Sequence, residues 1–143
     1  MSVFRHIGVC VDDSQAAANA LDTARRMRQA NASLSVVHCV EPPSFLVNLA
    51  AGLGGGVVPD SGPMVDAARA WVETLTEQGE TPVVLEGSPA RTISEWARDH
   101  GCDLLVLATS STGSAEGGLL GSVAQRLALD APCSTLLVRG TAD

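Results

Sequence analysis

The stretch Asp103-Leu104-Leu105-Val106-Leu107-Ala108 and the Gly-rich segment after it, residues 109–118, determine the fold that we predict. The nearly continuous apolar run indicates a strand buried on both faces of a parallel sheet. Apolar residues then recur at helical spacing from Gly121-Ser122 to Ala131-Pro132-Cys133, and Ser134–Arg139 follows as another buried strand. A strand, a flexible loop and a helix N-terminus in this order are how α/β proteins bind an anion or a nucleotide with backbone N–H groups.

The composition limits the classes of protein to which the chain can belong. Its 143 residues suit one domain, residues 1–143, and 45% hydrophobic against 17% charged residues indicate a globular protein. The net charge of −7 argues against a nucleic-acid or membrane surface, because contacts with phosphates need clustered basic residues. We find no signal peptide and no apolar run of the roughly 18 residues that a membrane span requires, so we expect a cytoplasmic protein.

The cysteines and histidines show no metal-binding or disulfide pattern. The four cysteines form no C-x-x-C pair and stand mostly in apolar runs, which indicates buried free thiols in a reducing cytoplasm. The three histidines have no metal-ligand spacing among themselves or with the cysteines, so we expect no metal site.

The rest of the chain alternates between strand and helix patterns. We predict strands at Phe4–Val11, Leu34–Val40 and Thr81–Glu86, the last at a sheet edge because of Pro82. We predict helices after Ser14, over Met64–Gln78, and from Gly87-Ser88-Pro89 to Gly101. The residues expected to face the core from these helices are Ala17, Ala20, Leu21, Ala24, Met27, Met64, Ala68, Trp71, Val72, Leu75, Ile93, Trp96 and Ala97.

Five strands alternating with four helices predict a single doubly wound α/β domain, with a parallel sheet and helices on both faces. Ligands of such sheets bind at the carboxyl ends of the strands where the strand order reverses. The first and fourth strands should flank this point, and they end at Asp12-Asp13 and at Ala108. Residues 42–63 form a long variable loop without periodicity, which is either a lid or partner-binding loop or a surface insertion.

Several motifs give the chain a resemblance to the universal stress protein family. They are Val11-Asp12-Asp13-Ser14, Val37-His38-Cys39-Val40, Gly87-Ser88-Pro89, Cys102–Leu107, Leu120-Gly121-Ser122-Val123 and Ala131–Arg139. The resemblance covers the chain apart from residues 43–63. It implies a Rossmann-like domain with strand order 3-2-1-4-5, and a homodimer formed through the last strand of each subunit.

The resemblance also implies a site for an adenine nucleotide (ATP, ADP or AMP) between the first and fourth strands. Asp12 would hold the ribose, although its position before a helix N-terminus is a sufficient role by itself. The family's binding motif is Gly, two residues, Gly, nine residues, Gly, then Ser or Thr. The chain keeps Gly121-Ser122 but has Ala108 and Ser111 at the first two glycines.

The expected nucleotide-binding residues are Val11, Asp12, Cys39, Ala108, Ser111, Gly113, Gly121, Ser122 and Val123. Val11 and Cys39 would border the adenine. Because no basic residue lies between Arg98 and Arg126, a triphosphate would depend on backbone N–H groups, two serine hydroxyls and a Mg²⁺ ion.

Two hypotheses of function follow from these observations. The first is a nucleotide-dependent stress-response or signalling module. The second is a dimeric interaction protein without a nucleotide, whose loop 43–63 contacts a protein partner. An enzyme is the weakest alternative, because the chain lacks G-x-x-x-x-G-K-[ST], G-x-S-x-G and H-E-x-x-H motifs, and we expect at most a weak, incidental ATPase.

Overall fold

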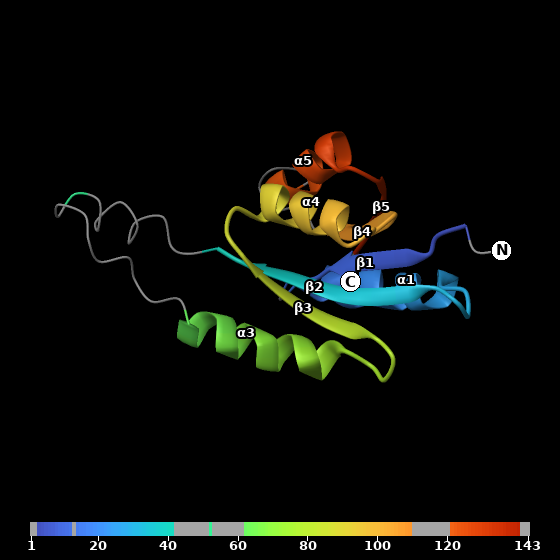
Figure 1. Cartoon of the computed structure of the whole chain (residues 1–143), viewed down its shortest axis with the longest axis horizontal. Helices are drawn as coiled ribbons and strands as arrows, with labels where there is room; N and C mark the ends of the chain where they lie inside the picture. Colours follow the sequence, from blue (N-terminus) through green and yellow to red (C-terminus); the bar gives the residue numbers. More distant parts are fainter. Residues whose placement is uncertain (1–2, 13, 42–51, 53–61, 110–120, 141–143) are drawn as a thin grey trace.

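A five-stranded parallel sheet forms the centre of the computed structural model, which describes residues 3–12, 14–41, 52, 62–109 and 121–140 (Figure 1). The sheet order is β3-β2-β1-β4-β5, which confirms the predicted doubly wound topology and order 3-2-1-4-5. The elements are β1 (His6–Cys10), α1 (Gln15–Met27), β2 (Ser33–Val40), α3 (Gly62–Leu75), β3 (Thr81–Glu86), α4 (Pro89–Asp99), β4 (Leu104–Thr109), α5 (Ser122–Asp130) and β5 (Ser134–Arg139).

Helices cover both faces of the sheet, and each face has its own apolar core. Alanines of α1 and Val72 of α3 pack on one face against β1, β2 and β4. On the other face, α4 and α5 pack over Val37, Leu105 and Leu107, and Figure 1 shows these two helices opposite α3. No helix of the described residues is long and apolar enough to cross a membrane.

The strands β1 and β4 are both covered by helices, and β1 is packed especially closely at Gly8. Leu104 to Leu107 of β4 are all buried, as expected for a strand covered on both faces. In β1, Gly8 allows the closest approach of α4, because a Cβ there would lie 2.9 Å from Cζ3 of Trp96. A glycine in a strand interior often marks such a close approach.

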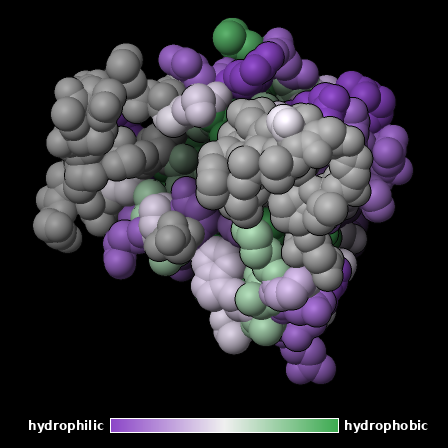
Figure 2. Space-filling model, turned by 90° about the vertical axis from the view of Figure 1, so that its left-hand side faces the viewer, coloured by the Kyte–Doolittle hydropathy of each residue, from purple (hydrophilic) through white to green (hydrophobic). Residues whose placement is uncertain are grey.

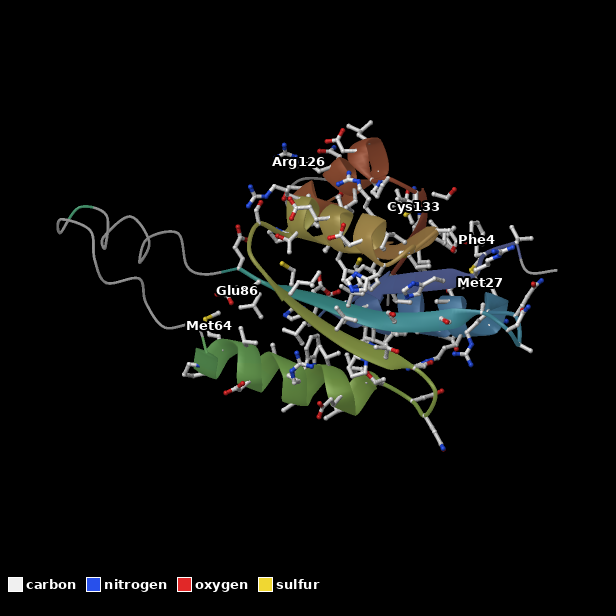
Figure 3. The ribbon with its side chains drawn as sticks, viewed as in Figure 1. Phe4, Met27, Met64, Glu86, Arg126 and Cys133 are labelled. Atoms are coloured by element: carbon white, nitrogen blue, oxygen red, sulfur yellow. The ribbon has the colours of Figure 1, made fainter. Side chains whose placement is uncertain are left out.

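Some predicted core positions are exposed. Met27 and Met64 have exposed fractions of 39% and 45%, because each lies in the terminal turn of its helix, where the stripe runs past the sheet (Figure 3). Strand β5 is half-buried rather than buried, because it lies at the sheet edge. The second helix also begins and ends earlier than Met64–Gln78, at Gly62 and Leu75, so the last residues of the expected loop 42–63 are helical.

An ion pair joins α1 to the connection between α3 and β3. Arg25 donates from Nε to Oε2 of Glu80 over 2.9 Å and from Nη2 to Oε1 over 2.8 Å. Arg25 also donates to the backbone oxygen of Leu75. The hydrogen bond with Arg25 lowers the pKa of Glu80, and the side chain of this glutamate is only 2% exposed.

Candidate functional site

The carboxyl ends of β1, β2 and β4 enclose a cavity with the N-terminal ends of α4 and α5, which we call the strand-end cavity. Its volume is about 330 Å³, within the range of small-molecule sites. Figure 2 looks onto this side of the molecule, where hydrophobic side chains show between hydrophilic ones. The lining residues are Cys10, Val11, Asp12, Val37, His38, Cys39, Pro89, Ile93, Leu107, Ala108, Gly121, Ser122, Val123 and Ala124.

Two hydrogen bonds join the residue that follows β1 to β2. The backbone N–H of Val11 donates to the oxygen of Val37 over 2.8 Å, and Nδ1 of His38 donates to the oxygen of Val11 over 2.8 Å. The His38 ring packs edge-on against Trp71 of α3, with ring centroids 5.0 Å apart. The backbone that enters the cavity is therefore held rigidly, as a preformed site requires.

Asp12 is oriented by Ser14. Its Oδ1 accepts hydrogen bonds from the backbone N–H of Ser14 over 2.9 Å and from the Ser14 hydroxyl. Ser14 is the N-cap residue of α1, as predicted, but its hydroxyl binds Asp12 and does not cap the helix. Both bonds go to one carboxylate oxygen, and Oδ2 has no hydrogen bond within the described residues. Asp12 therefore keeps an acceptor for a ligand hydroxyl.

The floor of the strand-end cavity is apolar and its two thiols are neutral. Val37 and Leu107 of the sheet and Ile93 of α4 belong to the core between the sheet and the helices α4 and α5. Burial raises the pKa of Cys10 well above its ordinary value, and burial followed by the charge of Glu41 raises that of Cys39 to about 11. Both thiols are protonated at neutral pH and act as small apolar groups.

The turn from β3 into α4 needs a glycine. Gly87 has φ +140°, and a Cβ there would lie 2.7 Å from Oγ1 of Thr92. Its backbone N–H donates to Val40 at the end of β2 over 3.0 Å. The turn thus brings Pro89, at the predicted start of α4, to the rim of the cavity.

The N-terminus of α5 supplies hydrogen-bond donors to the cavity. Gly121 is the N-cap, and the backbone N–H of Gln125 donates to its oxygen over 2.9 Å. The N–H groups of Ser122, Val123 and Ala124 precede this first bond and so have no partner inside the helix. All three residues line the cavity, and the first turn contains no acidic side chain. A helix N-terminus of this kind favours an anionic group.

The structure brings seven of the nine predicted site residues to this one cavity: Val11, Asp12, Cys39, Ala108, Gly121, Ser122 and Val123. Ser111 and Gly113 lie outside the described residues. The sequence analysis missed Val37, His38 and Ile93. His38 directly precedes Cys39 in β2. It could therefore have been predicted by including the sequence neighbours of each expected contact at a strand end.

Within the described part of the chain, no group of three His, Cys, Asp or Glu side chains is placed to hold a metal ion.

Comparison with known proteins extends these observations. The sequence matches the universal stress protein family over residues 4–139. A universal stress protein of Thermus aquaticus is 32% identical, in an alignment covering 96% of this chain and 100% of that protein. The fold resembles universal stress protein UspA from Lactobacillus plantarum, with 26% identity, a TM-score of 0.64, and 94% and 97% of the two chains covered. It also resembles a universal stress protein solved in complex with cAMP, with 23% identity, a TM-score of 0.64, and 98% and 100% covered.

Proposed function

The chain belongs to the universal stress protein family, and from this membership we propose that it is a stress-response module that binds an adenine nucleotide in the strand-end cavity. One observation carries the proposal: residues distant in the sequence, on β1, β2, β4 and α5, converge on a cavity with an apolar floor and a helix N-terminus at its rim. A relative with the same fold was solved with cAMP, which is compatible with this class of ligand.

The base would lie on the apolar side of the cavity. Val37, Leu107 and Ile93 offer an apolar surface, and Val11 and Cys39 line the same cavity. Asp12 would accept a hydrogen bond from a ribose hydroxyl at Oδ2, because Ser14 occupies only Oδ1. Loss of one hydrogen bond to a charged group costs about 1.5–3 kcal/mol.

The phosphates would face α5. The N–H groups of its first turn, which have no partner inside the helix, and the Ser122 hydroxyl supply donors. The partial positive charge of the helix N-terminus contributes about 0.3–1 kcal/mol per charge. A Mg²⁺ ion would accompany ATP through its phosphates. Ser111 and Gly113 remain predicted contributors to this end of the site.

We propose binding without turnover. The two cavity thiols are protonated at neutral pH, so neither provides a nucleophile. Nδ1 of His38 donates to the Val11 oxygen and the ring packs against Trp71, which gives this histidine a structural role. We therefore expect bound nucleotide to be recovered intact, with at most slow, incidental hydrolysis of ATP.

We further propose a homodimer that pairs through β5. This strand is at the sheet edge, and its four middle residues are half-buried within one subunit. An edge strand presents unpaired N–H and C=O groups to a second strand. The molar mass in solution, measured by light scattering, tests this: a monomeric mass at micromolar concentration contradicts it.

Two measurements test nucleotide binding. Small molecules released from freshly purified protein are compared with adenine-nucleotide standards, and melting temperatures are recorded with adenosine, AMP and Mg-ATP. A ligand at 100 times its Kd stabilises the folded state by about 2.7 kcal/mol. At about 3 °C per kcal/mol for a chain of this size, the melting temperature should rise by about 8 °C.

A matched pair of variants locates the site. Asp12→Asn keeps the acceptor for Ser14 but removes the charge facing the ribose, and it should weaken adenosine binding about tenfold. Asp22→Asn, on the exposed side of α1, should leave binding unchanged. No shift with any adenine compound at millimolar concentration refutes the proposal and favours the second hypothesis, an interaction protein that acts without a nucleotide.

A further inference from the structure

A second, larger hollow adjoins the strand-end cavity, and we call it the α4–α5 groove. Its volume is about 620 Å³. It lies between α4 and α5 on the side of the sheet that they cover. Its lining residues are Ser88, Pro89, Ala90, Arg91, Ser94, Ser122, Val123, Arg126 and Asp130.

The groove and the strand-end cavity are continuous at their walls. Pro89, Ser122 and Val123 line both of them. A ligand whose one end lies beside Asp12 and Ala108 can therefore pass the first turn of α5 and enter the groove. Two of the shared residues, Ser122 and Val123, carry the backbone N–H groups, and Ser122 also the hydroxyl, that a helix N-terminus offers to an anion.

The groove concentrates positive charge in an acidic protein. Arg91 and Arg126 both line it, whereas the chain as a whole has a net charge of −7. Both side chains are exposed, and neither forms an ion pair within the described residues. Figure 3 shows Arg126 on α5. Asp130 is the one carboxylate among the lining residues.

The spacing along both helices explains why the two guanidinium groups share this groove. Ser122 and Arg126 are four residues apart on α5, and Ser88 and Arg91 are three apart at the start of α4. Residues at these separations lie on the same helix face. Each arginine thus follows a serine that already lines the groove, one turn further from the N-terminus.

We propose that the α4–α5 groove binds the terminal phosphates of a nucleoside di- or triphosphate, with Arg91 and Arg126 as its cationic contacts. The inference rests on the proposed nucleotide site and names the part of the ligand that the strand-end cavity does not hold. Arginine suits this role because its planar guanidinium matches phosphate oxygens in a bidentate geometry. The groove supplies the positive charge that the stretch between Arg98 and Arg126 lacks in the sequence.

The proposal predicts an order of affinity. Each added phosphate reaches further toward the arginines, so the Kd should fall from AMP to ADP to ATP, with ATP bound roughly tenfold more tightly than AMP. The difference should shrink at high salt, because both guanidinium groups are exposed and their attraction for phosphate is screened.

The test is a matrix of ligands and variants measured by isothermal titration calorimetry. Arg91→Gln and Arg126→Gln should each weaken ATP about fivefold and leave adenosine and AMP within about twofold, since exposed charge pairs are weaker than buried ones. Asp130→Asn removes the opposing carboxylate and should strengthen ATP about twofold. Arg98→Gln, on the last turn of α4 and outside the groove lining, is the matched control.

The outcomes separate this inference from the function on which it rests. If adenosine and AMP bind but ATP binds no more tightly than AMP, the groove is not a phosphate site, while nucleotide binding stands. The same conclusion follows if the arginine variants weaken the binding of AMP and ATP equally. If no adenine compound binds, the proposed function fails and the inference fails with it. Inorganic tripolyphosphate provides an independent probe: it should compete with ATP in the unaltered protein, and a lack of competition contradicts the inference.

Discussion

Replacement of Gly8 by alanine tests whether α4 and the sheet are packed as closely as the structure shows. The new Cβ would lie 2.9 Å from Cζ3 of Trp96, 3.1 Å from Cδ2 of Leu105 and 3.2 Å from Sγ of Cys102. These three neighbours are at most 6% exposed, so none can move into solvent. The methyl group must therefore push the rigid indole of Trp96, and α4 with it, away from β1.

The expected magnitude is the difference between two effects. Overpacking a core by one methyl group costs about 1–3 kcal/mol. Alanine in place of glycine also restricts the unfolded chain, which stabilises the folded state by about 0.4–1 kcal/mol where the backbone accepts it. The net loss should be about 1–2 kcal/mol, or about 3–6 °C in melting temperature for a chain of this length.

Urea denaturation followed by circular dichroism and tryptophan fluorescence measures this loss. A double-mutant cycle assigns its cause: Leu105→Val shortens one of the crowded neighbours, so Gly8→Ala should cost less in its presence. Gly79→Ala is the contrasting control, because Gly79 has φ +88° and a Cβ added there would have no neighbour within 4 Å. The loss of stability that it causes should not depend on Leu105. If Gly8→Ala is neutral, the close contact between β1 and α4 is refuted, and if it shows no coupling to Leu105→Val, the crowding against Leu105 of β4 is refuted.

Three further predictions concern other parts of the molecule. Glu80→Gln should lower the free energy of unfolding by about 1–2 kcal/mol at pH 7, less than for a fully buried pair because Arg25 is 25% exposed. Since pairing lowers the pKa of Glu80 below its ordinary 4.5, this contribution is complete above pH 4.5 and disappears as the pH falls through the folded-state pKa, so denaturation curves of the two proteins should converge in acid. Burial raises the pKa of Cys102 to about 12, so iodoacetamide at pH 8 should label it far more slowly in the native than in the unfolded protein; equal rates by mass spectrometry contradict its burial. Val123→Trp should fill the strand-end cavity and abolish adenosine and ATP binding alike with little change in melting temperature, and undiminished adenosine binding would place the base elsewhere.

Local sequence signals determined the elements and some of their sequence bounds. The strands Thr81–Glu86 and Ser134–Arg139 have the predicted limits, and α4 begins at Pro89 after Ser88. The sequence predicts these features because the type and the ends of an element depend on residues close together in the chain. Hydrophobic periodicity indicates the type, and glycine and proline indicate the ends. The strand order came from the resemblance to the universal stress protein family.

Tertiary structure alone decided which faces are buried and which side chains meet. Met27 and Met64 continue apolar stripes yet are exposed, because burial depends on what lies opposite and not on spacing. Arg91 and Arg126 are 35 positions apart in the sequence, and only the packing of α4 beside α5 puts them in one groove. The sequence by itself specified the helices, the strands and the strand ends at which the predicted site residues stand. The shape of the strand-end cavity and the meeting of two arginines in the α4–α5 groove arise from contacts between distant segments, which local patterns do not encode.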